Sequence, residues 1–339
     1  MVGMTDLPAR ATRVAAERAV ELAVRAPSIH NTQPWRWVLA GDTLELRADR
    51  SRQLEAIDPD GRGLLVSCGG ALHLATVALA AAGWQVDVQR LPDPDDPDLL
   101  ARLRIGERGA PDDAAQAVAD AAERRHTERR PFRPEPVPEA LLDDLRRLIA
   151  GPGVYAHVIT RDSERLDLAV VFSWADQLEA GDDAYRAELA RWVRPDAEQA
   201  GEGVPPSAVP HVPGGSPRHT EVPVRDFELG AAGTEHIAEA VDEEPAYLVV
   251  FTAGDSAEAR LRAGEAYVQL SVEAERFGLA SSALTQAIDL PGVRERLRTL
   301  MDWPDHPQMI LRVGWPPAGG APPTTPRRKV ADVLTVAEH

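Results

Sequence analysis

The first fifty residues change from helical to strand-like spacing of their apolar side chains. Between residues 12 and 25, apolar residues recur at i, i+3, i+4, i+7 and i+8, and most charges lie off this stripe. This spacing predicts an amphipathic helix. Residues 35–39 and 43–48 then alternate apolar with polar side chains on either side of Gly41-Asp42, which predicts two strands joined by a turn.

A long apolar stretch follows. Residues 64–83 carry few polar side chains on any face, so they predict a helix that is buried nearly all round. Gly69 and Gly70 inside this stretch would allow another backbone to approach closely. Alternation over 84–89 predicts a strand, and the apolar residues near 103–105 mark a further short strand.

The remainder of the chain supplies a second set of elements. Its apolar patterns again change between helical and alternating spacing, which favours an α+β fold. The expected helices are 112–130, 138–150, 184–193 and 259–277, and the expected strands are 154–159, 246–252, 279–287 and 309–315.

The two sets follow the same plan. Helix, turn and strand at 138–160 repeat the arrangement of 14–40, and the helix at 259–277 matches the one at 64–83. Both long helices end on a glycine, and a strand follows each. A repeat on this scale indicates one supersecondary unit used twice. The sequence therefore predicts a duplicated α+β unit, with a first half at 1–110 and a second half at 111–339.

Residues 171–230 interrupt the second copy. They contain one expected helix and then, over 201–223, a stretch rich in proline and glycine with little apolar content. Long irregular inserts of this kind are either linkers or lids over a site. The pattern leaves both alternatives open.

Charge narrows the class of partner. The 339 residues carry a net charge of −17, which argues against non-specific nucleic-acid binding and against attachment to anionic membranes. We expect no leader at the N-terminus and find no run of 18 uninterrupted apolar residues, so a soluble cytoplasmic protein is expected. An acidic protein that binds an anion must gather its arginines locally.

The cysteine and histidine residues predict neither a disulfide nor a metal site. The single cysteine, Cys68, excludes an intrachain disulfide, and its apolar surroundings predict a buried structural thiol. The nine histidines show no metal-ligand spacing, so no metal site is expected. The chain also lacks a P-loop and a Gly-x-Ser-x-Gly motif.

The connector between the first helix and the first strand is unusual. It comprises residues 26–35, Ala-Pro-Ser-Ile-His-Asn-Thr-Gln-Pro-Trp, with two prolines, several hydrogen-bonding side chains and no formal charge. Pro27 should stop the incoming helix at about Arg25. The pattern alone favours a loop whose polar side chains satisfy their own backbone. The alternative is a stiff ligand-binding connector.

A second polar stretch closes the helix predicted at 112–130. It places four arginines within residues 123–130, and helical spacing would put Arg125 and Arg129 on one face. A solvated helix end, whose cations oppose the helix dipole, and a phosphate site are about equally supported by the residues.

The connector at 26–35 resembles the Pro-Ser-x-x-Asn-x-Gln-Pro-Trp signature of FMN-dependent nitroreductases. The form with Ala-Pro-Ser-x-His-Asn-Thr-Gln-Pro-Trp resembles the dormancy-associated, tandem-duplicated Acg-type branch of that family. The resemblance implies that Pro27, Ser28, His30, Asn31 and Gln33 bind the flavin.

Three weaker matches extend the resemblance, which implies FMN contacts for each of them. Residues 125–129 resemble the family's Arg-x-Ser-x-Arg/Lys element for the phosphate and ribityl chain. Residues 279–287 lie where the family approaches the flavin N5, although a plain strand is the alternative. The basic run at 326–329 resembles a C-terminal phosphate element, although a solvated tail is equally supported. The residues involved are Arg125, Thr127, Arg129, Thr285, Gln286, Arg327 and Arg328.

The resemblance also implies an assembly. Nitroreductases are homodimers whose FMN lies between an arginine element of one subunit and a Pro-Ser-Asn-Gln element of the other. This chain keeps one of each, on opposite halves. An intramolecular pseudo-dimer, monomeric in solution and with one intact flavin site, is therefore expected, and the Acg-type branch implies that the insert at 171–230 covers the flavin.

The leading functional hypothesis is an FMN-dependent oxidoreductase. NAD(P)H would reduce the flavin, and a nitro compound or quinone would accept the electrons. The flavin carries the redox step, so no catalytic side chain is assigned. Two alternatives are an FMN-sequestering protein with little turnover, because a lid covers the flavin, and a flavin-free binding module.

Overall fold

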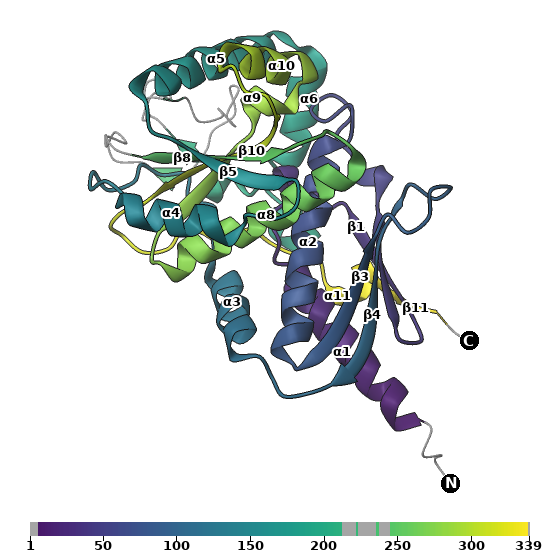
Figure 1. Ribbon diagram of the computed structural model, residues 1–339. Helices are drawn as coiled ribbons and strands as arrows, with labels where there is room; N and C mark the ends of the chain where they lie inside the picture. Colours follow the sequence, from purple (N-terminus) through teal and green to yellow (C-terminus); the bar gives the residue numbers. More distant parts are fainter. Residues whose placement is uncertain (1–5, 212–221, 223–234, 237–244, 338–339) are drawn as a thin grey trace.

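The computed structural model describes residues 6–211, 222, 235–236 and 245–337. The chain forms two mainly antiparallel sheets with helices between and around them (Figure 1). The α+β class expected from the sequence is confirmed.

The first sheet has the strand order β11-β1-β2-β4-β3. Its four N-terminal strands pair antiparallel, and β11, from the C-terminal end of the chain, joins β1 in parallel. The strands are β1 (Trp35–Ala40), β2 (Thr43–Ala48), β3 (Trp84–Arg90), β4 (Leu99–Arg108) and β11 (Leu334–Val336), and the accompanying helices are α1 (Asp6–Ala23), α2 (Arg62–Ala81), α3 (Asp113–Arg124) and α11 (Val330–Val333).

The second sheet has the order β5-β8-β10-β9, with every neighbouring pair antiparallel. Helices α4 and α8 lie on one side of this sheet, and α5 and α10 lie on the other (Figure 1). The strands are β5 (Val154–Ile159), β8 (Ala246–Thr252), β9 (Ala280–Leu284) and β10 (His306–Gly314), and the helices are α4 (Glu139–Leu148), α8 (Ala257–Arg276), α9 (Gln286–Asp289) and α10 (Pro291–Leu300).

The segment between β5 and β8 is longer than the insert expected at 171–230. Its first helix begins at Asp162, ahead of the expected boundary. The described elements of this segment are α5 (Asp162–Gly181), α6 (Asp183–Trp192), α7 (Ala197–Ala200), the 3-10 turn at Pro206–Ala208, and the two-residue strands β6 (Pro210–His211) and β7 (Glu235–His236). Part of the proline-rich stretch at 201–223 lies outside the described residues.

The two sheets share one connectivity. Apart from β11, the first sheet runs β1-β2-β4-β3 and the second runs β5-β8-β10-β9. In chain order, each set consists of a helix, two strands, a long helix and two further strands. In the second set, α5 to α7 are inserted after the first strand, and α9 and α10 are inserted before the last strand. Gly83 and Gly278, which follow the two long helices, both adopt positive φ, the conformation that favours glycine after a helix.

The two long helices pack directly on each other between the sheets (Figure 1). A Cβ built on Gly69 would lie 1.9 Å from the carbonyl oxygen of Leu261, and one built on Gly264 would lie 2.0 Å from that of Val66. Backbones this close leave no room for any side chain. The close approach expected at Gly69 is therefore confirmed, and its partner is α8.

Helix α2 is a core element. An 18-residue window in it has mean hydropathy 1.9, enough for a membrane span by length and composition, but 72% of the window is buried inside the protein. Such burial is typical of a core helix. Cys68 on this helix is fully buried and unpaired, as expected, and burial raises the pKa of its thiol.

The first helix ends at Ala23, close to the end expected at about Arg25, and the N–H of Val24 still donates to the carbonyl of Val20. One predicted length was wrong. The strand expected to be short near residue 105 is the ten-residue β4, which pairs with both β2 and β3. Pairing on both sides sustains a strand longer than its weak alternation indicated.

Replacement of either contact glycine by alanine should separate the two helices. For Gly69→Ala and Gly264→Ala we expect a loss of about 1–3 kcal/mol in the free energy of unfolding, the usual cost of overpacking. The control is Gly292→Ala in α10, where a Cβ meets nothing within 4 Å, and the expected change is within about 0.5 kcal/mol. Urea denaturation measures all three, and equal stability of the Gly69 and Gly292 variants would contradict the packing.

Candidate functional site

The connector at residues 26–35 forms a strained bend rather than a plain turn. A single 3-10 turn, Ile29–Asn31, occupies its centre. His30, Asn31 and Gln33 have φ values of 44°, 57° and 49°. A non-glycine residue at positive φ costs of order 1–3 kcal/mol and persists where the surroundings hold it in place. Three such residues within four positions mark this bend as a candidate functional site.

The bend is fixed to the first half by hydrogen bonds. Ser28 Oγ accepts the backbone N–H of Gln33 at 2.9 Å, so this serine does satisfy its own loop. Ser67 Oγ on α2 accepts the N–H of Ile29 at 3.1 Å. The thiol of Cys68 donates to the carbonyl of Pro34 at 3.3 Å. These contacts tie the bend to the N-terminal part of α2.

A cavity lies against this bend, and residues from both the N-terminal and the C-terminal sheet regions line it. The bend and the start of α2 form one wall, and Tyr267 of α8 with residues of β9, α9 and β10 form the other. Among the residues expected from the sequence to bind a cofactor, the cavity is lined by Pro27, Ser28, His30, Asn31, Thr127, Arg129, Thr285, Gln286 and Arg327.

The arginine-rich segment reaches the cavity in a different conformation from the one expected. Helix α3 ends at Arg124, so the helical face proposed for Arg125 and Arg129 is wrong. Thr127 forms a parallel bridge with Ser281, and the N–H of Glu128 donates to the carbonyl of Ser281 at 2.9 Å. The segment thus touches β9 at Thr127, and Arg125, Thr127 and Arg129 all line one pocket.

A basic pocket adjoins the cavity and shares Thr127, Arg129, Thr325 and Arg327 with it. Arg25 and Arg125 complete the set of arginines around this pocket. Glu123 is the one carboxylate among the described residues that line it. Four guanidinium groups facing one carboxylate in a protein of net charge −17 make a local anion site.

The basic pocket carries more positive than negative side-chain charge. Arg125 is buried, and burial lowers the pKa of its guanidinium. Burial, and then the neighbouring charges of Arg125 and Arg25, lower the pKa of Arg327 to about 9. Within the described ranges the Arg125 side chain makes no hydrogen bond or ion pair. The charge of Arg125 therefore has no paired carboxylate among the described residues, and an anion bound in the pocket would be stabilised there.

Gln33 and Arg328, which the family resemblance assigned to the flavin, lie outside the cavity lining. Gln33 Nε2 donates to the carbonyl of Gly201 at 2.7 Å, and its Oε1 accepts the N–H of Arg328 at 2.9 Å. Asn31 lines the cavity, but its Nδ2 donates to the carbonyls of Gly203 and Pro326 at 2.8 and 2.9 Å. The amides of the bend therefore hold other segments of the chain.

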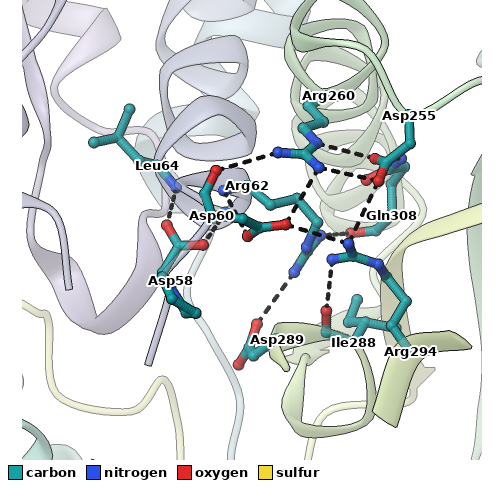
Figure 2. Close-up of polar contacts among 12 residues, drawn as sticks. Asp58, Asp60, Arg62, Leu64, Asp255, Arg260, Ile288, Asp289, Arg294 and Gln308 are labelled. Atoms are coloured by element: carbon teal, nitrogen blue, oxygen red, sulfur yellow. Dashed lines mark hydrogen bonds and ion pairs between the residues drawn. The ribbon is translucent and has the colours of Figure 1, made fainter. Parts of the chain in front are cut away.

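A buried polar network crosses between the halves beside the cavity (Figure 2). Arg62, at the start of α2, donates to the carbonyl of Gln308 and to Asp289 Oδ1, the latter at 3.2 Å. Arg294 and Arg260 both bridge Asp60 to Asp255. Arg62 and Asp289 are each 1% exposed and also line the cavity, so the network forms part of its wall.

Asp58 caps the start of α2 beside this network. Its two carboxylate oxygens accept the N–H groups of Gly63 and Leu64, each at 2.8 Å (Figure 2). Burial raises the pKa of Asp58 to about 6, since the desolvation of the carboxylate outweighs these two hydrogen bonds. On the far side of the network, burial would raise the pKa of Asp255, but hydrogen bonds and charges from Arg260, Gln308 and Arg294 outweigh it and lower the pKa to about 2.

Sequence reasoning missed several lining residues. Arg25 ends the first amphipathic segment and was counted as one of its surface charges. Thr325 lies just before the basic run that was assigned. Tyr267 and Met309 belong to a core helix and a core strand and carry no separate signal. Arg62 and Asp289 could have been noticed as charges beside apolar runs.

The arrangement suits a ligand with two unlike ends. The cavity offers apolar side chains together with hydroxyl, amide and imidazole groups, and the basic pocket offers arginines in excess of carboxylates. A molecule with a partly apolar, hydrogen-bonding body and an anionic end fits this chemistry. No group of three or more His, Cys, Asp or Glu side chains among the described residues could hold a metal ion.

Comparison with known proteins identifies the family. "Putative NAD(P)H nitroreductase Rv3131" of Mycobacterium tuberculosis is 38% identical over 323 residues, covering 94% of this chain and 90% of that protein. "Putative NAD(P)H nitroreductase acg" of the same species is 35% identical, covering 94% of each chain. "Probable NAD(P)H nitroreductase PigM" of Serratia is 25% identical. The chain therefore belongs to the nitroreductase family, in the group that includes Acg.

Other comparisons are less informative. No protein-family model matches the chain. Among solved structures, a nitroreductase with bound FMN from Bacteroides fragilis aligns with a TM-score of 0.40 and 14% identity, over 65% of this chain and 98% of that one. A nitroreductase with bound FMN from Desulfitobacterium hafniense aligns with a TM-score of 0.41 and 12% identity, over 66% and 98%. Scores of this size do not by themselves establish a shared fold.

The raised pKa of Asp58 predicts a pH-dependent stability. The folded protein holds this proton below about pH 6 and the unfolded chain only below about pH 4, so the stabilising contribution is present at low pH and is lost as the pH rises through 6. Relative to Asp58→Asn, the wild type should gain about 1 kcal/mol of unfolding free energy between pH 7 and pH 5. Urea denaturation at both pH values measures this, and a constant difference would contradict it.

Proposed function

We propose that this chain binds one FMN in the cavity between its halves and works as an NAD(P)H-dependent oxidoreductase. The observation that carries the proposal is the basic pocket that opens from the cavity, with the buried Arg125 lacking a carboxylate partner among the described residues. The phosphate monoester of FMN carries nearly two negative charges at neutral pH, which is the complement that this pocket needs.

The side chains divide the task of holding FMN. Arg125, Arg129 and Arg327 would bind the phosphate, with Arg25 at the exposed rim of the pocket. Ser28, His30 and Thr285 would lie along the body of the cofactor. When bound, FMN supplies the redox chemistry, and the chain orients it and excludes water.

We infer that the chain is an intramolecular pseudo-dimer divided near residue 110. The shared strand order of the two sheets supports a duplication, since the match includes which strand follows which helix. The site is asymmetric, because the bend comes from the first half while the arginine-rich segment comes from the second. One flavin per chain and a monomer follow. The C-terminal strand β11 returns to the first sheet, so the second half also completes the first.

The names of the relatives suggest the reductant and the acceptor. Rv3131 and Acg are each named "Putative NAD(P)H nitroreductase", and PigM is named "Probable NAD(P)H nitroreductase". By analogy a reduced nicotinamide would donate a hydride, and a nitro compound or quinone would accept the electrons. No acid or base of this chain is assigned to these steps.

A second function is favoured by one observation. Val204, from the insert, lines the cavity and is 1% exposed, and it follows two glycine carbonyls that are bonded to the bend. This contact supports a role for the insert as a cover that would limit the access of a nicotinamide. An FMN-sequestering protein with little turnover is consistent with this cover.

The test is anaerobic reduction of the purified protein. A yellow protein whose absorption near about 450 nm is bleached by NADPH or NADH within seconds would establish an oxidoreductase. A yellow protein that resists both nicotinamides but is bleached by dithionite would establish sequestration. A colourless protein that takes up no FMN on titration would overturn both functions.

Two arginine variants test whether FMN binds at the basic pocket. Arg125→Gln should lower FMN affinity about 10- to 100-fold, since a hydrogen bond to a charged group contributes about 1.5–3 kcal/mol. Arg146→Gln, at the exposed end of α4 where Arg146 pairs with Asp143, should leave FMN affinity unchanged. Equal affinities in the two variants would place the cofactor elsewhere.

A further inference from the structure

We propose that Asn31 and Gln33 act as a clamp that fastens two segments over the cavity, and that they are positioning residues rather than flavin ligands. The segments are the strap, residues 201–204 of the insert, and the tail, residues 325–328. The clamp itself concerns the chain alone. Its consequence for flavin release rests on the proposed function.

Gln33 has no access to the cavity. Its side chain is fully buried, and both ends of its amide are already engaged. Nε2 donates to the strap at the carbonyl of Gly201, at 2.7 Å, and Oε1 accepts from the tail at the N–H of Arg328, at 2.9 Å. One side chain of the bend therefore joins two segments that are separated from it by 168 and 295 positions in sequence.

Asn31, which lines the cavity, also joins the strap to the tail. Both N–H groups of its amide donate, one to the carbonyl of Gly203 and the other to that of Pro326, and Oδ1 accepts Arg327 Nη1 at 3.3 Å. In addition, the N–H of Gly203 donates to the backbone carbonyl of Asn31 at 3.2 Å. No N–H of this amide remains for a ligand.

The strap is built to be held this closely. Gly201 and Gly203 have φ values of 70° and 77°, and a Cβ on them would lie 2.9 Å from the carbonyl oxygen of Arg327 and 2.7 Å from that of Trp192. Glycine is thus required at both positions for conformation and for space. Between them, Glu202 pairs with Arg52 and Arg194.

Each clamped segment contributes to the cavity wall. The strap places Val204 there, and the tail places Thr325 and Arg327 there. Asn31 and Gln33 both have positive φ, and the hydrogen bonds of their amides to these segments help to hold the strained backbone in place. Release of the clamp should open the cavity on the side of the insert while leaving α2 and the bend in place.

The test is amide hydrogen exchange in flavin-free protein. Gln33→Glu keeps the acceptor for Arg328 but replaces the donor to Gly201 with a carboxylate oxygen. We expect exchange at residues 201–204 to rise at least about 10-fold, with the tail and α2 unchanged. Asn31→Asp removes both donors and should raise exchange in the strap and the tail together. Gln199→Glu, exposed on the adjoining α7, is the matched control and should change neither.

Several results would overturn the clamp. If either variant leaves strap exchange at the wild-type level while FMN affinity falls, the residue is a flavin ligand and the clamp is wrong. If the strap is released equally by Gln199→Glu, the effect is one of added charge. If the amides of α2 also exchange faster, that variant has unfolded globally. The exchange of the strap in the remaining variant then tests the clamp. In loaded protein, Gln33→Glu should release FMN at least about 10-fold faster. If no variant binds FMN, the proposed function fails, and strap exchange still decides the clamp.

Discussion

The direct contact between α2 and α8 is the constraint on which the rest of the structure depends. Their backbones meet at Gly69 and Gly264, so the distance between the helices is fixed by main-chain atoms rather than by adjustable side chains (Figure 1). Each helix packs against its own sheet, and the separation of the two sheets follows from this contact. The cavity takes walls from both halves, so its width is set by the same contact.

Hydrogen bonds and ion pairs further join the elements that the contact between α2 and α8 brings together. The network around Arg62, Asp60 and Arg294 joins the start of α2 to α9 and β10 beside the cavity (Figure 2). Since Arg62, Asp289 and Arg294 are buried, removal of one partner would leave an unpaired charge, which makes the alignment of these elements specific. On the opposite side of the bend, Asn31 and Gln33 bind the strap and the tail. The site is thus bounded by contacts between segments that are far apart in the sequence. The bend at residues 26–35 therefore depends on the rest of the chain for its hydrogen-bond partners.

Much of the fold could be predicted from the sequence, because spacing and composition act locally. The apolar stretch at 64–83 and the alternation in β1 and β2 predicted a core helix and two strands, and all three are present. The conformation of Arg125 could not be predicted, because its segment pairs with β9, about 155 positions away, and this pairing overrides a helical pattern. The roles of Asn31 and Gln33 were hidden for a similar reason: their partners are backbone carbonyls, which carry no sequence signal. Asp58, whose carboxylate caps α2, was visible only as part of a turn.

If the arginines of the basic pocket bind a phosphate, the protein should prefer a flavin that carries one. Comparison of FMN with riboflavin on the flavin-free protein tests this most directly, because the two differ only in the phosphate. Fluorescence titration should give FMN a dissociation constant at least about 100-fold lower, the worth of two charge-assisted hydrogen bonds. Equal dissociation constants for FMN and riboflavin would contradict the account.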